Sequence, residues 1–281
     1  SENIPITTEY FFSEMAVYGT TDVGASKFMD DWATKLTPTS FIGTSGNGGA
    51  SNAIGYFWDQ GYLGVKYANQ VISNIDGVSG LAQDKKNMYK GQAYFQRAWH
   101  YSHLVFQFGD IPLVAKILEV PKQNYKSTKK EAILDMLVSD MEKAVQWVPN
   151  QSGLSYIGQV NKGACRTLLA KLYLATGQWK KAELQCDTLI NNLDGTDYHL
   201  MKECFGTEET TGSPATKGIT RNVMWDLHRP QNKLCAENKE VIMGMVNQGE
   251  SGTGAVGVQW LRIFLPWYDR TLRATSSSKT N

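Results

Sequence analysis

Five aromatic residues of this chain stand outside any helical spacing: Trp32, Phe41, Trp260, Trp267 and Tyr268. Polar side chains lie near them in the sequence, namely Asp30, Asp31, Asn47, Asn52, Gln259 and Arg262. Pyranose rings present flat C–H faces that stack on aromatic rings, and their hydroxyl groups need amide, carboxylate or guanidinium partners. This chemistry makes six residues candidate ligand-binding residues: Trp32, Phe41, Asn52, Trp260, Trp267 and Tyr268. The alternative is that the rings only anchor their loops to the domain.

Residues suited to catalysis or metal binding are sparse. Asp30 and Asp31 form a tight carboxylate pair, but no recognisable catalytic context accompanies them. His100 and His103 have a spacing that would let them share a metal ion, yet no carboxylate follows at a zinc-type spacing. Nucleophile-elbow, phosphate-loop and dinucleotide motifs do not occur in the sequence. We therefore predict no catalytic residues, no metal and no cofactor.

The overall composition is that of a globular protein and excludes two classes of partner. The chain has 281 residues, of which 42% are hydrophobic, and its formal net charge is +1. Because basic and acidic residues balance, we expect no nucleic acid partner and no charge-driven membrane attachment. The spacing of the four cysteines fits no metal motif, and we expect Cys165 and Cys186 to be small core residues.

One long aromatic helix is predicted at residues 81–108, and it ends abruptly. Phe95, Ala98, Trp99, Tyr101, Val105 and Phe108 recur at steps of three and four, which predicts one broad buried face. Gly109 suits a helix cap with positive φ, and Pro112 prevents the helix from resuming.

Four more helices are predicted around it. Apolar spacing from Trp58 to Ile75 predicts the preceding helix. A capping box at 128–131 predicts the start of another, which Pro149 ends. Two further helices are expected at 162–176 and 178–192. The run 240–246 is typical of a strand or a buried segment.

The last helix pair resembles a tetratricopeptide repeat. Ala170, Tyr173, Gly177, Trp179 and Ala182 match the small, Tyr, Gly, aromatic and Ala positions of that pattern. The predicted fold class is all-α, with tetratricopeptide-like helical hairpins and long irregular loop insertions. We predict one partial domain over 1–281, with a helical core at 58–192 and loop-rich, ligand-side segments at 1–57 and 193–281.

Five segments in order resemble the SusD/RagB family. The strongest is Gly91–Val114, where Ala93, Phe95, Arg97, Ala98, Tyr101, Leu104, Val105, Phe108, Gly109, Asp110, Pro112 and Leu113 match the family's signature helix. Trp58, Tyr62, Asn69 and Ile72 resemble the helix before it. Asp140, Ala144 and Pro149 resemble the helix after it. The pair at 163–182 and the segment 240–242 follow in the family's order.

The resemblance implies a non-catalytic, surface-exposed lipoprotein of the outer membrane. Such a protein binds a glycan, or in the RagB branch a peptide, and caps a SusC-like TonB-dependent transporter. Family members are usually longer and carry an N-terminal lipidation cysteine, so we expect this chain to be the middle of such a protein and its lipid anchor to lie elsewhere. Two other functions stay open: a tetratricopeptide adaptor for proteins, and an all-α enzyme that cleaves glycans.

Overall fold

The computed structural model describes residues 53–118, 120, 123–155, 158–207 and 221–244. The compact unit Trp58–Val246 contains nearly all of them. The prediction of one domain over 1–281 stays a prediction, since 1–52 and 245–281 lie outside the described residues. In the described part, regular structure is almost entirely helical, which confirms the all-α prediction: α3 (Ala53–Asn74), α4 (Gln83–Phe108), α5 (Lys130–Trp147), α6 (Lys162–Ala175), α7 (Trp179–Ile190) and α8 (Val223–His228).

Short elements connect these helices. In the described part of the chain, 3-10 turns lie at Ile75–Gly77, Gln151–Gly153 and Pro230–Asn232. The strands β1 (Ile111–Pro112) and β2 (Ser127–Thr128) pair in antiparallel register and close the loop between α4 and α5 at its base. None of the described helices combines the length and the apolarity needed to span a bilayer.

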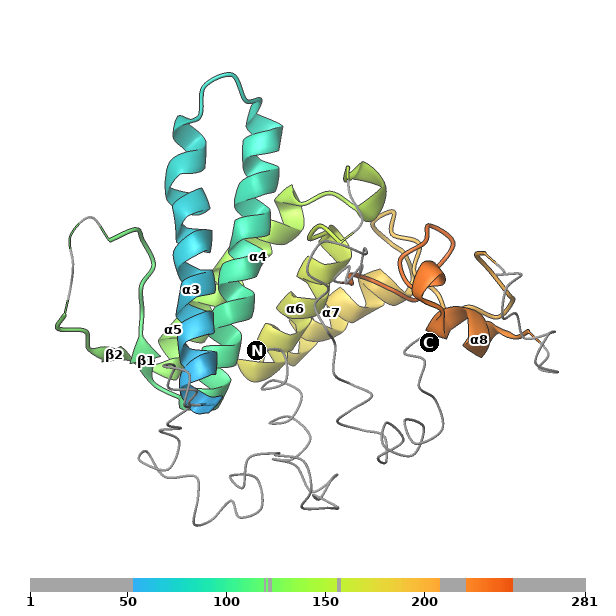
Figure 1. Ribbon diagram of the computed structural model, residues 1–281. Helices are drawn as coiled ribbons and strands as arrows, with labels where there is room; N and C mark the ends of the chain where they lie inside the picture. Colours follow the sequence, from blue (N-terminus) through green and yellow to red (C-terminus); the bar gives the residue numbers. More distant parts are fainter. Residues whose placement is uncertain (1–52, 119, 121–122, 156–157, 208–220, 245–281) are drawn as a thin grey trace, which may run out of the picture. The chain divides into compact units, whose positions relative to one another are not determined.

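Successive helices pack against one another and share one core. Helix α5 packs on α4, α6 on α5, and α7 on α6. Figure 1 shows α3 and α4 side by side, joined by the turn at the top of the picture. The core residues are aliphatic and aromatic and come from all of these helices; the most deeply buried include Val65, Tyr101, Leu104, Ile133, Leu137, Met141, Leu169 and Leu172.

Two glycines allow α3 to approach α4 closely. A Cβ on Gly61 would lie 2.7 Å from Leu104 Cγ, and a Cβ on Gly64 would overlap the imidazole of His100. Ring contacts continue the same interface, with the centroids of Trp58 and Phe108 at 5.1 Å and those of Tyr62 and Tyr101 at 6.1 Å. The spacing of glycines one turn apart therefore sets this helix contact.

Helix α4 follows its predicted bounds, with two exceptions on its buried face. Gly109 ends it with φ 72°, as the cap required. Trp99 was expected on the buried face, but it is 40% exposed; its ring stacks on Phe95 and lies tilted against His103. Arg97 is the opposite case, because it is only 5% exposed. An arginine can lie there because an acidic residue of α5 pairs with it.

The prediction of a capping box at the start of α5 is wrong. Lys129 occupies the N-cap position, and no side chain of the 128–131 segment caps the helix. Asp110 of the turn after α4 takes that role: its Oδ1 accepts the Lys130 backbone N–H at 3.0 Å, and its Oδ2 lies 2.8 Å from Lys129 Nζ. A carboxylate at a helix N-terminus also opposes the positive end of the helix dipole.

The predicted α6–α7 hairpin is present. Ala170, Tyr173 and Ala182 are buried between the two helices, and Gly177 makes the turn with φ 72°. Trp179 begins α7 but is 65% exposed. Cys165 is buried as expected, whereas the core prediction for Cys186 is wrong, because this residue lies on the exposed face of α7.

The segment after α7 contains little regular structure. Of the run 240–246, residues 240–244 are described and form no strand; Ile242 and Met243 are half-buried against the helical core. The second alternative for that run, a buried segment, is thus the closer one. All four cysteines fall among the described residues and are free thiols.

Candidate functional site

The six candidate ligand-binding residues lie outside the described part of the chain. Trp32, Phe41 and Asn52 precede residue 53, and Trp260, Trp267 and Tyr268 follow residue 244. Their role as a site stays a prediction. The same holds for Asp30 and Asp31.

The two histidines of α4 differ in their surroundings. His100 is half-buried against Gly64, and burial, with a smaller contribution from His103, lowers its pKa. His103 is exposed and its Nδ1 lies 2.7 Å from the Trp99 carbonyl oxygen of its own helix. Within the described ranges, no three His, Cys, Asp or Glu side chains gather where a metal ion could be held.

A buried ion pair joins α4 to α5. Arg97 donates from Nε and Nη2 to the two carboxylate oxygens of Asp140, each at 2.8 Å. Its Nη1 donates to Asn69 Oδ1 of α3 and to the Ala115 carbonyl oxygen, each at 3.0 Å. Burial raises the pKa of the Asp140 carboxyl, and the Arg97 guanidinium opposes that rise. The bidentate geometry and the extra acceptors are what a buried guanidinium requires.

The same network fixes the chain that follows the Gly-Asp-Ile-Pro turn. Asn69 Nδ2 donates to the Val114 carbonyl oxygen at 2.7 Å, and Tyr101 Oη accepts the Val114 N–H at 2.6 Å. Tyr62 Oη donates to the Pro112 carbonyl oxygen at 2.7 Å. Residues 112–115 are therefore held against α3 and α4 by four side chains, counting Arg97.

A groove lies between this fixed segment and α3, and we call it the aromatic groove. Its volume is about 440 Å³. Aromatic and aliphatic side chains form most of its lining, together with two lysines and two amides: Trp58, Tyr62, Val65, Lys66, Asn69, Gln70, Pro112, Val114, Lys116, Ile117, Leu118 and Tyr125. In Figure 1 the loop that forms its outer wall projects beside α3, between β1 and β2.

A second cavity, which we call the polar pocket, lies among three segments that follow α5, α7 and α8. Its volume is about 410 Å³. Amides, hydroxyls, one carboxylate and one phenol ring line it together with aliphatic residues: Asn150, Gln151, Ser152, Ser155, Thr196, Asp197, Tyr198, Asn238, Lys239, Leu234, Val241 and Ile242. The segment 234–244 is attached to the helices by Asn161, whose Nδ2 donates to the Ile242 carbonyl oxygen at 2.6 Å.

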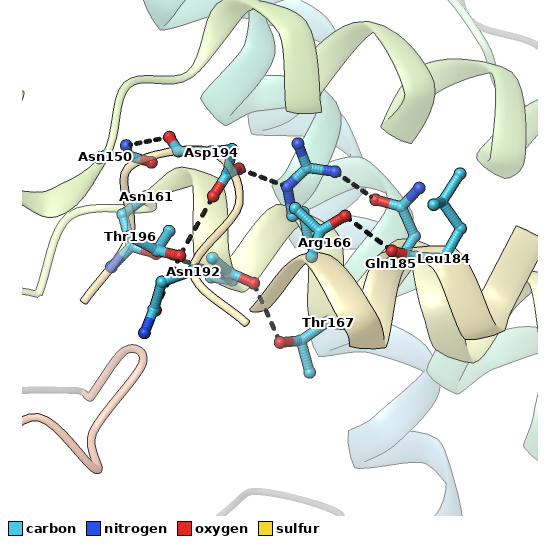
Figure 2. Close-up of polar contacts among 12 residues, drawn as sticks. Asn150, Asn161, Arg166, Thr167, Leu184, Gln185, Asn192, Asp194 and Thr196 are labelled. Carbon is cyan, nitrogen blue, oxygen red and sulfur yellow. Dashed lines mark hydrogen bonds and ion pairs between the residues drawn. The ribbon is translucent and has the colours of Figure 1, made fainter. Parts of the chain in front are cut away.

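Figure 2 shows the polar contacts that position one wall of this pocket. Arg166 of α6 donates from Nε to Asp194 Oδ2 at 2.6 Å, and from Nη1 to Gln185 Oε1 of α7 at 2.6 Å. Thr196 Oγ1 donates to Asp194 Oδ1 at 3.1 Å. Burial raises the pKa of Asp194, but the hydrogen bonds and charge of Arg166, with those of Thr196, outweigh it and lower that pKa. An ionised Asp194 thus holds the 194–196 turn onto α6.

Two details of the pocket bear on what it could bind. Asn150 Nδ2 donates to the Asp194 carbonyl oxygen, while its buried Oδ1 has no hydrogen-bond partner in the part of the chain that the structure describes. Burial, and then the charge of Asp194, raises the pKa of Tyr198 to about 12, so its phenol is neutral and can donate. A free acceptor, a phenol donor and several hydroxyls suit a ligand rich in hydroxyl groups.

A family model described as starch-binding and associating with the outer membrane matches residues 9–174, more than half of the chain. The chain belongs to the SusD-like family. The match confirms the resemblance. The structure also gives the resemblance a physical basis. Three of the polar residues that carried it, Asn69, Arg97 and Asp140, come from three helices and meet in the buried network.

Two curated relatives of the SusD-like chain come from Formosa agariphila. SusD-like protein P2 is 29% identical over 205 residues, which cover 64% of this chain and 40% of that protein. SusD-like protein P25 is 23% identical over 190 residues, which cover 63% of this chain and 36% of that protein. The SusD-like chain therefore spans 40% or less of the length of each of these relatives.

Solved structures share the fold. A SusD-like protein from Bacteroides fragilis is 21% identical with a TM-score of 0.54, and the match covers 72% of this chain and 35% of that one. A SusD-like carbohydrate binding protein from the same species is 21% identical with a TM-score of 0.52, over 69% of this chain and 33% of that one.

Sequence reasoning missed both cavities. The aromatic groove contains Trp58 and Tyr62, which had been singled out only as positions in the helical spacing of residues 58–75 and in the family resemblance. The polar pocket combines loops that are about 40 to 90 residues apart, and no local motif marks it. The available signal was the density of Asn, Ser and Thr residues in the segments after α5 and α7.

Proposed function

We propose that this SusD-like chain is part of a glycan-binding, non-catalytic component of a TonB-dependent nutrient uptake system. The observation that carries the proposal is the family match over residues 9–174, whose description joins starch binding to the outer membrane. The whole protein is taken to be a surface-exposed lipoprotein of that membrane, with an oligosaccharide as ligand. Since the chain spans only part of its relatives, further contacts to the ligand are expected from the rest of the protein.

The chemistry of the described cavities is compatible with binding without catalysis. The polar pocket offers hydroxyl, amide and phenol groups, and among the described residues Asp197, which Lys239 pairs at 3.2 Å, is the single carboxylate that lines it. Glycoside hydrolysis requires two carboxylates flanking the bond to be cleaved. Hydrogen bonds to sugar hydroxyls require no shifted pKa.

The loop aromatics remain the proposed principal ligand site: Trp32, Phe41, Asn52, Trp260, Trp267 and Tyr268. Affinity electrophoresis against a panel of soluble polysaccharides tests the function. We expect at least one polysaccharide to retard the parent chain, and Trp260→Ala and Trp267→Ala to weaken that retardation without loss of fold. Retardation by none of the polysaccharides, together with tight binding of peptides, would favour the RagB-type alternative.

The partner proposal is a SusC-like transporter that this protein caps. Purification of the full-length protein from outer membranes in mild detergent should recover a large β-barrel in the same complex. An assay for new reducing ends on the bound polysaccharide tests the absence of catalysis. Release of reducing ends by a purified chain would overturn the non-enzyme proposal and favour the glycan-cleaving alternative.

A further inference from the structure

The aromatic groove has a charge and a rigidity that the proposed function does not use. Two of its rings are held in fixed orientations: Trp58 lies between Tyr62, at 4.9 Å between centroids, and Phe108, at 5.1 Å. The hydroxyl of Tyr62 is tied to the Pro112 carbonyl oxygen. Rings that are already ordered lose little conformational entropy when a ligand stacks on them.

Among the described residues, the lining of the groove carries positive charge without negative charge. Lys66 stands on α3 one turn after Tyr62, and Lys116 directly follows Ala115, whose carbonyl oxygen is fixed by Arg97. No Asp or Glu lines the groove among the described residues, and neither lysine forms an ion pair with a described residue. The polar pocket differs, because Lys239 there is paired with Asp197.

The wall of the groove is unsuited to adding a peptide strand. The carbonyl oxygens of residues 112, 114 and 115 already accept side-chain hydrogen bonds, and the Val114 N–H is bonded to Tyr101. Strand addition needs free backbone donors and acceptors along an edge. A ligand that uses ring faces and side-chain charges fits the groove better.

We propose that the aromatic groove is a second glycan site, selective for oligosaccharides that carry carboxylate or sulfate groups. Sugar rings would stack on the platform of Trp58, Tyr62 and the 37% exposed Tyr125, while Lys66 and Lys116 pair with the anionic substituents. Gln70 is placed to bond ring hydroxyls. This inference rests on the proposed function and names the class of glycan that this groove takes.

Isothermal titration on the 281-residue chain tests the proposal with three probes: tetragalacturonate, a sulfated tetrasaccharide and neutral maltotetraose. The double variant Lys66→Gln/Lys116→Gln removes the two charges. Lys85→Gln/Lys171→Gln removes two exposed lysines elsewhere on the helices and is the matched control. An exposed ion pair changes affinity by up to a factor of about five. We therefore expect the groove variant to weaken binding of at least one anionic probe by about five- to twentyfold, and the control to leave it unchanged.

A second pair of variants tests the stacking platform. Tyr125→Ala should weaken binding of the anionic probe severalfold. Tyr89→Ala, which removes a ring that is 40% exposed on α4, should not. Melting temperatures of all variants should stay near that of the parent, because each altered side chain is exposed.

The outcomes separate the two proposals. Equal affinity of the parent and the groove variants for both anionic probes would overturn the groove site, and glycan binding would stand if any polysaccharide still bound elsewhere. Tight binding of maltotetraose with the same dependence on Tyr125 and none on the lysines would overturn the anionic selectivity. Lysine-dependent binding of an acidic peptide, with no binding of anionic sugars, would overturn it in favour of a docked protein segment. No binding of any glycan would remove both proposals.

Discussion

Breaking the Arg97–Asp140 pair should be among the most destabilising single changes in the helical core. The two side chains are 7% and 5% exposed, so Asp140→Ala leaves a guanidinium with almost no access to water. Asn69 and Ala115 would still accept from Nη1, but both carboxylate bonds would be lost. Removing one partner of a buried pair costs about 3–5 kcal/mol. That is a large share of the about 5–15 kcal/mol by which folded proteins are usually stable.

Urea unfolding followed by circular dichroism measures this loss. The matched control is Glu183→Ala, which breaks the exposed pair with Lys180, whose side chains are 57% and 92% exposed. That change should shift the free energy of unfolding by no more than about 0.5 kcal/mol. The double variant Arg97→Met/Asp140→Leu replaces both charges with apolar groups and should cost less than Asp140→Ala alone.

If the unfolding free energies of Asp140→Ala and Glu183→Ala differ by less than about 1 kcal/mol, then the loss of Asp140 does not leave a buried guanidinium without a counter-charge. If the double variant is less stable than Asp140→Ala, then the contacts of Arg97 to Ala115 and Asn69, and not the ion pair, are the main contribution.

Three further predictions concern other parts of the core. Gly64→Ala should destabilise the chain by about 1–3 kcal/mol in thermal or urea unfolding, since the overlap with His100 outweighs the gain in helix propensity of about 1 kcal/mol. The control Gly77→Ala, with no atom within 4 Å of the added Cβ, should be neutral or stabilising. Equal changes in stability for the two variants would contradict the close contact between Gly64 and His100. Mass spectrometry after brief iodoacetamide treatment should show native Cys186 modified and Cys165 protected, and rapid labelling of Cys165 would mean that α6 is not packed as described. Burial raises the pKa of Cys165 to about 12, so its protonated form stabilises the fold below the ordinary thiol pKa, and this contribution is lost as pH rises toward 12. Cys165→Ala should therefore make the fall of the unfolding free energy between pH 9 and 12 shallower, by up to about 1.4 kcal/mol per pH unit. An unchanged slope would refute this.

The helices could be predicted from the sequence because each has its own apolar period and its own stop. Helix α4 was expected at 81–108 and observed at Gln83–Phe108, and the glycine and proline after it act locally. The capping box failed because Asp110, 20 residues before Lys130, is brought to the same place by the pairing of β1 and β2. Helical spacing also misplaced Trp99, which it put on the buried face. It made no statement about the burial of Arg97, because the partner of that side chain, Asp140, lies on another helix.

The candidate cavities were harder to anticipate for the same reason. The aromatic groove needs α3 and the 112–118 segment to lie together, and only the contacts of Tyr62 and Asn69 fix that arrangement. The polar pocket depends on the Arg166–Asp194 pair between residues 28 positions apart. Trp32, Asn52, Trp260 and the other predicted site residues remain to be tested by binding measurements.

The contacts at the base of the α4–α5 loop have a consequence for how the sequence of this loop can vary. Asp110 joins the end of one helix to the start of the next, and β1 pairs with β2 just beyond it. The two ends of the loop between the strands are therefore held together. Doubling the length of a loop whose ends are joined costs only about 0.6 kcal/mol. Insertions between Lys116 and Tyr125 should leave the helices in register while they reshape the outer wall of the aromatic groove. Recognition at that wall can diversify independently of the stability of the core.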